Sequence, residues 1–506
     1  MKDYILKRPM LLCGILCSFL AVLGCYFKVL LPLFAAVITL FLIILIIKKS
    51  SASSVLVAMC VMAVIISLIY SHGRADILSK LNNQESSCEF IVCEITYKGD
   101  NYYKADVQIT DSEHLKSGTK ITVSYFEDNL KMGDRAKGKL ELKDLKDNDY
   151  KNLYYSKGVF LTASLKDYKV LDNGSDFVLS LIGKFRDYIT KALFSNLNYS
   201  NAATASAIIL GNDGYFTPSF NLDIKASGVS HVMVVSGMHL STFVLMITFI
   251  TERLFYNRYL RAVIMCLTVI FMIAVCGFTA SMIRAGVTYF LMALALVLKR
   301  KGVPENTLGA AVTLIVIASP CTILNIGFLL SVLATFGVVG VALPIVSFIR
   351  NRKIVKSKLL YLIISAITVN VSATVCTLPV TVSSFKCVSV VSVLSNLLIS
   401  LAVDVILWSA VFGLALNVLY PALAKVAFLV TKVAAYYINW AISFFGGLDF
   451  AVISVPGYAA IVFIVLIILI FYALLACKKR IDMVKLKEMR KKLALEGGKC
   501  KNGCGF

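Results

Sequence analysis

Apolar runs of about 20 residues recur along this chain and constrain its fold more than any other feature. The chain has 506 residues, of which 58% are hydrophobic and 16% are charged, and its mean hydropathy is +0.81. A soluble protein of this size has too small a core to hide so much apolar surface, whereas runs of this length match the thickness of a lipid bilayer. The sequence therefore predicts a polytopic α-helical membrane protein.

The apolar runs form two blocks on either side of a more polar stretch, and together they predict about 12 transmembrane spans. The first block holds three runs, over residues 10–27, 30–47 and 54–70. The runs of the second block begin near residues 229, 259, 281, 306, 324, 358, 389, 421 and 453. Because both blocks hold an odd number of spans, the two termini are expected on one side of the membrane and the polar stretch on the other.

The formal net charge of +22 raises the question of nucleic-acid binding. Lysines and arginines gather at the ends of the apolar runs, in the loops 299–301 and 350–358, and in the tail 478–506. Basic loops stay on the cytoplasmic side of a membrane, so membrane topology accounts for much of this charge. We therefore expect a multi-pass plasma-membrane protein with both termini in the cytoplasm and the polar stretch outside the cell.

The polar stretch shows the period-two alternation that is typical of β-strands. Strands are expected at residues 90–97, 105–109, 121–125, 140–142 and 159–165. Glycine- and aspartate-containing turns separate these segments, as they do in compact all-β domains. Five short strands in so small a domain predict an OB-like barrel, with a β-sandwich as the alternative.

Between the β domain and the second block, residues 177–197 are amphipathic, because apolar side chains recur there every four residues. Such a helix can lie in the membrane interface or pack on its own protein, and the sequence does not favour one of these over the other. The predicted domains are a three-span membrane segment 1–72, an extracellular β domain 85–172, a helix and linker 173–227, a membrane domain 228–477 and a basic cytoplasmic tail 478–506.

Residues 228–239, GVSHVMVVSGMH, place two of the chain's four histidines inside an apolar run. Ionisable side chains are expensive within a membrane and usually have a function there. Ser236 and His239 are neighbours on a helix surface, and Ser230 and His231 precede them. The pattern predicts a polar pore lining or gate, and the alternative is a pair of histidines bonded to nearby carbonyls. Two histidines are too few ligands for a metal, so we expect no cofactor.

A Ser/His nucleophilic pair is the alternative of a different class. Ser236 with His239 or His231 would supply the nucleophile and the base. No acid and no oxyanion-hole signature accompanies them in the sequence, so we do not expect an enzyme.

Further polar residues interrupt the apolar runs downstream. Arg284 is a permanent cation near the start of a run, where it can contact a phosphate, pair with a buried acid such as Asp404, or extend to the interface. Asn325, Ser331 and Asn396 are uncharged polar residues within apolar runs, and hydrogen bonds between helices can explain them.

These residues resemble the ComEC family of competence proteins. The matching segments are residues 207–211 (AIILG), 227–239 (SGVSHVMVVSGMH), 277–285 (GFTASMIRA), 327–331 (GFLLS), Leu378-Pro379 ahead of Phe385, and 396–398 (NLL). The resemblance covers about residues 10–475, and its most specific part is the Ser-His…Ser-Gly-x-His block. The positions that match the family pattern are Ser230, His231, Ser236, His239, Arg284, Gly327, Phe328 and Ser331.

The resemblance implies a plasma-membrane channel that passes one strand of DNA into the cytoplasm during natural transformation, with residues 228–477 as the channel domain. The implied partners are single-stranded DNA, a DNA-receptor protein outside and a DNA-translocating ATPase inside. Membrane lipid is a further expected partner, and the sequence leaves the oligomeric state open, with a homo-oligomer as one alternative. No phosphate-binding GxxxxGK[ST] loop occurs, so the expected motor is a separate protein.

The chain departs from the family pattern in three places. Many members continue into a metallo-β-lactamase-like domain, whereas this chain stops after its basic tail, so we expect no nuclease activity in this chain, the alternative being a nuclease on a separate polypeptide. Asn325 stands where members often have aspartate, and Leu401 stands where they often have proline. An intramembrane Ser/His hydrolase and a transporter of another polymer or of lipid remain the alternative functions.

Overall fold

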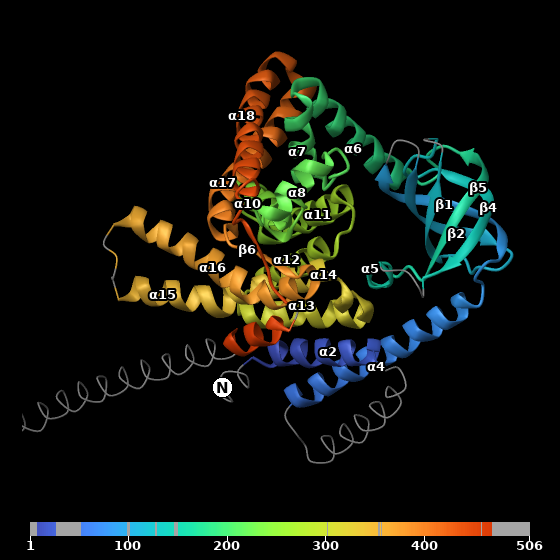
Figure 1. Cartoon of the computed structure of the whole chain (residues 1–506), viewed down its shortest axis with the longest axis horizontal. Helices are drawn as coiled ribbons and strands as arrows, with labels where there is room; N and C mark the ends of the chain where they lie inside the picture. Colours follow the sequence, from blue (N-terminus) through green and yellow to red (C-terminus); the bar gives the residue numbers. More distant parts are fainter. Residues whose placement is uncertain are drawn as a thin grey trace, which may run out of the picture.

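The structure, a computed structural model, describes residues 8–26, 52–98, 102–126, 129–145, 150–300, 302–352, 355, 357–456 and 458–467. Among them it contains eight helices that are long and apolar enough to cross a membrane, together with a closed five-stranded barrel. Figure 1 shows the barrel at one side of the helical body. A mostly helical membrane protein with a small β domain is therefore confirmed. The predicted span 30–47 and the tail 478–506 lie outside the described residues.

The observed helices follow the predicted spans closely. The first block contains α2 (Pro9–Tyr26) and α4 (Ala52–Ser79). The second contains α11 (Arg258–Cys276), α12 (Ala280–Val297), α13 (Pro304–Ala318), α16 (Lys358–Phe385), α17 (Ser392–Leu419) and α18 (Pro421–Gly446). After α18 the short strand β7 (Val452–Ser454) pairs with β6 (Cys387–Ser389), and residues 459–467 are helical.

Two of the predicted spans are interrupted. The span expected from residue 229 is divided into α9 (Ser230–Met233) and α10 (Gly237–Leu254). The span expected from residue 324 follows the 3₁₀ turn η2 (Pro320–Leu324) and consists of α14 (Ile326–Phe336), the π-helical η3 (Gly337–Ala342) and α15 (Leu343–Asn351). Broken helices inside a membrane are tolerated where they are buried in protein or line a polar path.

The β domain is a closed barrel with the strand order β1-β2-β3-β5-β4. Its strands are β1 (Glu85–Lys98), β2 (Tyr103–Ser112), β3 (Lys120–Tyr125), β4 (Arg135–Asp144) and β5 (Leu161–Asp172). Alternate residues point inward, so Val107, Ile121 and Leu140 are almost fully buried, as the period-two pattern predicts. The barrel prediction is confirmed, and the sandwich alternative is wrong. The short helix α5 (Lys151–Ser156) joins β4 to β5.

The amphipathic segment forms α6 (Phe177–Asn196), which runs from the barrel towards α17 and α18 (Figure 1). Part of its predicted apolar stripe is buried in the helical body, and part is exposed. Ile189 and Leu193 are buried in the helical body, whereas Phe177 is 75% exposed and Leu181 is 56% exposed. One half of α6 therefore packs on the protein, and the other half presents an apolar surface.

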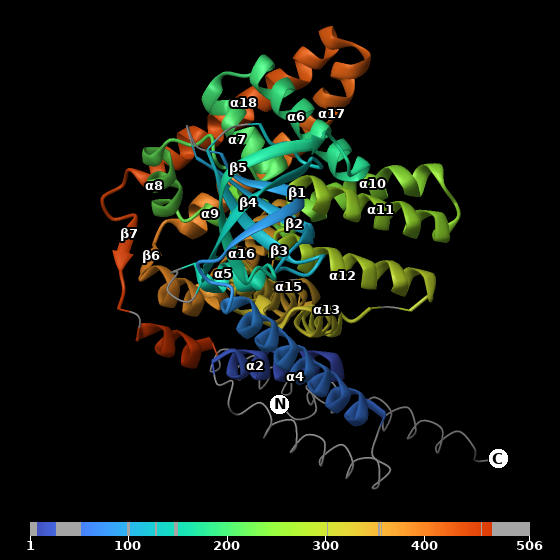
Figure 2. The same cartoon turned by 90° about the vertical axis from the view of Figure 1, so that its right-hand side faces the viewer.

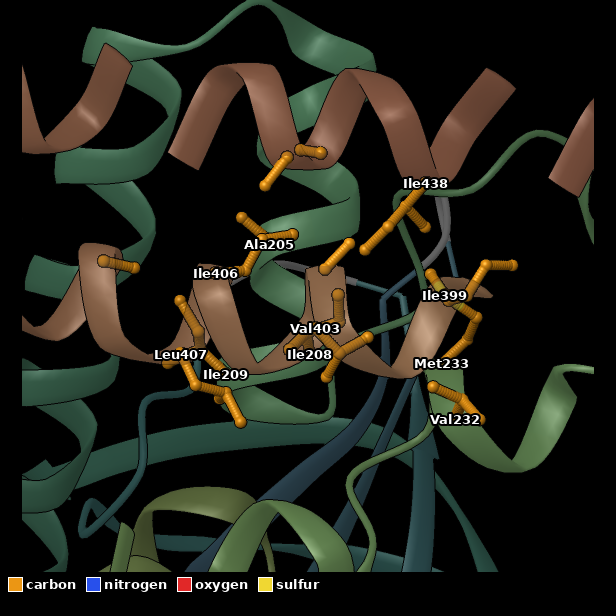
Figure 3. Packing of buried hydrophobic residues seen from close by; sticks show 14 of the residues in the cluster. Ala205, Ile208, Ile209, Val232, Met233, Ile399, Val403, Ile406, Leu407 and Ile438 are labelled. Atoms are coloured by element: carbon orange, nitrogen blue, oxygen red, sulfur yellow. The ribbon is translucent and has the colours of Figure 1, made fainter. Parts of the chain in front are cut away.

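The helix that follows, α7 (Tyr199–Leu210), is short and buried along almost its whole length. Figure 3 shows Ile208 and Ile209 of α7 packed among side chains of α9, α17 and α18, including Val403 and Ile438. Gly211 ends the helix in the left-handed conformation that glycine adopts easily. α7 therefore contributes to the largest apolar core among the described residues.

Contacts from α5 and from β1 help to attach the barrel to the helical body, in front of which it lies in Figure 2. Ser156 of α5 bonds the start of α14, because its hydroxyl accepts from Asn325 Nδ2 at 2.9 Å. Glu94 of β1 lies 3.7 Å from Arg186 of α6 and also touches Gly277, at the end of α11. Both contacts reach loops that begin helices of the membrane domain.

Candidate functional site

The break between α9 and α10 is built by Ser236 and His239. Ser236 is the N-cap of α10, and its hydroxyl accepts from the Met238 N–H at 3.3 Å. In return, His239 Nδ1 accepts from the Ser236 N–H at 2.9 Å, which completes a capping box. Because Nδ1 is an acceptor, the neutral ring carries its proton on Nε2. The two residues that the sequence pairs on one helix surface therefore meet, and they define how α10 begins.

Gly237, the first residue of α10, packs directly on Arg284 of α12. A Cβ at position 237 would lie 2.8 Å from Arg284 Nη2 and 3.1 Å from the Ala285 Cβ. Glycine allows this approach without any movement of the guanidinium group, so the glycine of the Ser-Gly-x-His block has a packing role. This contact brings together two of the segments that match the family pattern, 227–239 and 277–285.

Arg284 is 7% exposed, and Ser331 of α14 holds its guanidinium group. Arg284 Nε donates to Ser331 Oγ at 2.8 Å, and Ser281 Oγ donates to the same oxygen at 3.0 Å. Gly237, Ser281, Arg284 and Ser331 all lie in the first two turns of their helices. The N-terminal parts of α10, α12 and α14 therefore meet at a buried cation.

The sequence suggests an ion pair between Arg284 and Asp404 as one alternative, and this alternative is wrong. Asp404 of α17 instead accepts from Thr242 Oγ1 of α10 at 2.8 Å. Within the described ranges, neither Arg284 nor Asp404 has an oppositely charged partner. The guanidinium is also buried, so extension to the interface does not describe it.

Asn325 caps α14, since its Oδ1 accepts from the Phe328 N–H at 3.1 Å. Phe328 is fully buried in the core that α2, α4 and α13 share. Next to the cap, a Cβ on Gly327 would lie 3.1 Å from Asn325 Oδ1. The Gly-Phe pair therefore positions the start of α14, the helix that carries Ser331.

The first half of the Ser-His block lies apart from Arg284. The side chains of Ser230 and His231 are exposed, and Ser230 Oγ donates to the Ile224 carbonyl at 3.4 Å. Gly228, at φ +76°, packs instead against Ser389 and Ser392 at the start of α17. The beginning of the block thus packs against the start of α17, and its end packs against α12.

Several buried polar atoms have no hydrogen-bond partner in the part of the chain that the structure describes. Three of them in the membrane domain and in α7 are His239 Nε2, Asn396 Oδ1 and Ser206 Oγ. A buried polar atom without a partner costs about 1–3 kcal/mol, so such atoms mark places where a ligand, water or a moving group is expected. No three His, Cys, Asp or Glu side chains within the described ranges lie close enough to share a metal ion.

Sequence reasoning missed Ser281 and Thr242, the direct partners of Ser331 and Asp404. It also missed a polar network on α7, where Thr204 donates to Asn439 Oδ1 and Asn201 accepts from Asn439 Nδ2 at 3.0 Å. Asn439 could have been selected from the sequence, because it is an amide within an apolar run. Its partners could not, because they are more than 200 residues away in the chain.

The comparison with protein families supplies the functional finding. The family model described as "Competence protein" matches residues 208–480, which is more than half of the chain. The chain belongs to the competence protein family. This membership gives the competence protein a role in DNA uptake, with DNA as the kind of molecule it handles. No curated protein and no solved structure matched it in these comparisons. The matched segment contains Gly237, His239, Arg284 and Ser331, so the buried cation lies within the family's own domain.

Proposed function

We propose that this competence protein is a plasma-membrane channel for the inward passage of single-stranded DNA, and that Arg284 contacts the phosphates of the strand. Arg284 carries the proposal: it is a buried cation without a carboxylate partner among the described residues. An unpaired buried charge is strongly unfavourable unless an anion neutralises it, at least transiently. A passing phosphodiester is such an anion.

The helix ends around Arg284 support the same proposal. The N-termini of α10, α12 and α14 add partial positive charge, which favours phosphate binding. Discontinuous helices whose N-termini face a substrate are a known way to handle anions within a membrane. The site is polar but weakly charged, which suits a path that must release each phosphate again.

The barrel supports an external contact with the strand. The exposed rings of Tyr102 and Phe126 lie 5.9 Å apart at neighbouring ends of β2 and β3, and Lys104 Nζ is 5.6 Å from the Tyr102 ring centre. Aromatic rings beside a cation form a platform on which unpaired bases stack. In the proposed arrangement the barrel is an OB-type domain outside the cell, and both termini are cytoplasmic. A DNA-receptor protein outside and a DNA-translocating ATPase inside complete the system.

The same arrangement includes the five predicted domains and a contact with membrane lipid, and it allows assembly as a homo-oligomer. We place the remaining polar residues, Asn325, Asn396 and Asp404, along the path or at its gate. His231 is exposed, so it is available to the path, whereas His239 acts through the start of α10.

The test is DNA import in a competent host whose own channel gene is deleted and replaced by this gene. Arg284→Ala should lower transformation at least a hundredfold, while labelled DNA still binds to the cell surface. Arg253→Ala removes an exposed arginine from α10 and serves as the matched control, with no expected change. Normal transformation by Arg284→Ala, at wild-type protein levels in the membrane, would contradict the proposal.

One observation favours the hydrolase alternative, because Ser236 Oγ lies 3.2 Å from His239 Nδ1. That nitrogen already accepts a backbone N–H, and His239 Nε2 has no carboxylate partner in the described ranges, whereas a triad needs one. Ser236→Ala separates the two functions. Retained DNA import in this variant would exclude serine chemistry from the transport step.

A further inference from the structure

A second cationic site lies far from Arg284 along the chain, where the end of α6 meets α18. The structure has a pocket of about 310 Å³ there. Ser195, Asn196, Lys425, Phe428, Leu429 and Lys432 line this pocket. Two of these residues are lysines in a helix that is long and apolar enough to cross a membrane.

Lys425 and Lys432 are seven residues apart, so they lie on one face of α18, two turns and about 10 Å apart along its axis. α18 contains no aspartate or glutamate, and neither lysine has a carboxylate partner in the part of the chain that the structure describes. Placing two uncompensated ammonium groups on such a helix is unfavourable in a membrane unless an anion accompanies them.

The rest of the pocket restricts the chemistry of that anion. Ser195 and Asn196 add a hydroxyl and an amide beside the lysines, while Phe428 and Leu429 supply an apolar wall. On α18 the apolar surface continues outward, with Val426 and Val433 both 63% exposed. A ligand that fits all of this has a negatively charged head, polar atoms near it and long apolar chains.

We propose that this pocket binds the phosphate headgroup of an anionic phospholipid, with its acyl chains along the exposed apolar face of α18. The volume holds one headgroup rather than a continuous strand. Phe428, the aromatic ring in the pocket, is only 1% exposed and is not available to stack on a nucleic-acid base. The site is therefore separate from the DNA path proposed above.

The bound lipid has a structural consequence. α6 links the barrel to the membrane domain, and its last turn forms one wall of the pocket. The lipid therefore holds the end of α6 against α18, and anionic lipid in the membrane stabilises the position of the barrel relative to the channel domain.

The experiment uses the full chain, incorporated into vesicles of equal parts phosphatidylglycerol and phosphatidylcholine and then released for native mass spectrometry of the retained lipid. The wild type should retain phosphatidylglycerol in preference to phosphatidylcholine. Lys425→Gln and Lys432→Gln should each reduce this preference about fivefold, because each loses one lysine–phosphate contact, and the double variant should reduce it further.

The double variant Lys425→Arg/Lys432→Arg keeps both charges and should retain the preference, which separates lipid binding from misfolding. Lys184→Gln/Lys191→Gln removes two exposed lysines of α6 outside the pocket, and it should behave as the wild type. Equal retention of the two lipids by the wild type would overturn the proposal. So would an unchanged preference in Lys425→Gln/Lys432→Gln. If that variant instead weakens binding of a single-stranded oligonucleotide in pure phosphatidylcholine, the pocket belongs to the DNA path and the lipid proposal is wrong.

Discussion

The charged side chains of the barrel form ion pairs, whereas two charged residues of the membrane domain, Arg284 and Asp404, form none with any described residue. On the barrel, Glu89 pairs with Arg135 at 2.8 Å and with Lys137 at 3.2 Å, and Lys166 bridges Glu85 and Glu141. In the membrane domain, Arg284 and Asp404 bond hydroxyl groups, and within the described ranges neither meets an opposite charge.

This difference indicates that charged groups contribute to stability in the barrel and to the proposed transport around Arg284. Exposed ion pairs such as those of the barrel contribute about 0–1 kcal/mol each, and the apolar core supplies most of the barrel's stability. Arg284 does not stabilise the membrane domain well, because its buried charge has no carboxylate partner among the described residues. We expect barrel variants to change stability first and variants around Arg284 to change transport first.

The largest expected effect is on barrel stability. Phe90 is fully buried in the barrel core, so Phe90→Ala should lower the free energy of unfolding of the barrel by about 3–5 kcal/mol. Limited proteolysis of the full chain in membranes, followed over temperature, measures this loss. Lys137→Ala, which removes one exposed ion pair, is the matched control and should change it by less than about 1 kcal/mol. Equal effects from both variants would contradict the division of roles.

Gly237→Ala tests the membrane side of the comparison. The new Cβ would lie 2.8 Å from Arg284 Nη2 and must displace the guanidinium group. We expect DNA import to fall about tenfold, equivalent to about 1.4 kcal/mol, with normal membrane insertion. Gly73→Ala is the control in α4, because a Cβ there has no neighbour within 4 Å. Unchanged import in Gly237→Ala would show that the position of Arg284 is unimportant.

A smaller effect is expected at His239. If its role is to cap α10, then His239→Gln preserves the capping box and retains most of the import, whereas His239→Ala loses about 1 kcal/mol of helix stabilisation and about fivefold in import. Import measured side by side in the two variants decides this. A complete loss in His239→Gln would instead assign the imidazole a chemical role and remove the capping explanation.

The smallest effect concerns the junction between the two regions. Burial raises the pKa of the Glu94 carboxyl above its usual range, although Arg186 and Lys157 oppose this and Asp106 adds to it. The folded state therefore binds this proton more tightly than the unfolded state does. The resulting stabilisation is present at pH values below the ordinary glutamate pKa and is lost as the pH rises through the raised value.

Glu94→Gln should remove this part of the pH dependence and leave stability at neutral pH equal to that of the wild type or slightly higher. The measurement is the thermal unfolding midpoint of the barrel from acidic to neutral pH. A clear loss of stability at neutral pH in Glu94→Gln would mean that the 3.7 Å contact with Arg186 outweighs the penalty of burial.

Much of the architecture could be read from local patterns. Period-two alternation located the barrel strands, and long apolar runs located the helices from α11 to α18, because both signals depend on neighbouring residues alone. The same reasoning selected Ser236, His239, Arg284 and Ser331, since polar atoms in apolar runs are conspicuous. Ser236 and His239 were also expected to meet, because they are only three residues apart.

The partners across helices could not be read in this way. Sequence reasoning considered Asp404 for Arg284, whereas the folded chain places Ser331 beside Arg284 and Thr242 beside Asp404. Sequence reasoning did not decide whether α6 lies in the membrane interface or packs on the protein. In the fold, one half of α6 packs on the protein and the other half is exposed. Whether Gly237 had a conformational or a packing role depended on what lies opposite it.

The sequence by itself determined that this chain is a helical membrane protein with a small β-barrel, and it determined which polar residues the membrane domain carries. Hydrophobicity and periodicity act over one or two turns of chain, so they are present before any tertiary contact forms. Only the tertiary structure decided that the starts of α10, α12 and α14 meet at Arg284, that α7 is buried, and that Lys425 and Lys432 share a pocket with α6. Those arrangements depend on how helices distant in sequence pack together, and no local pattern encodes that geometry.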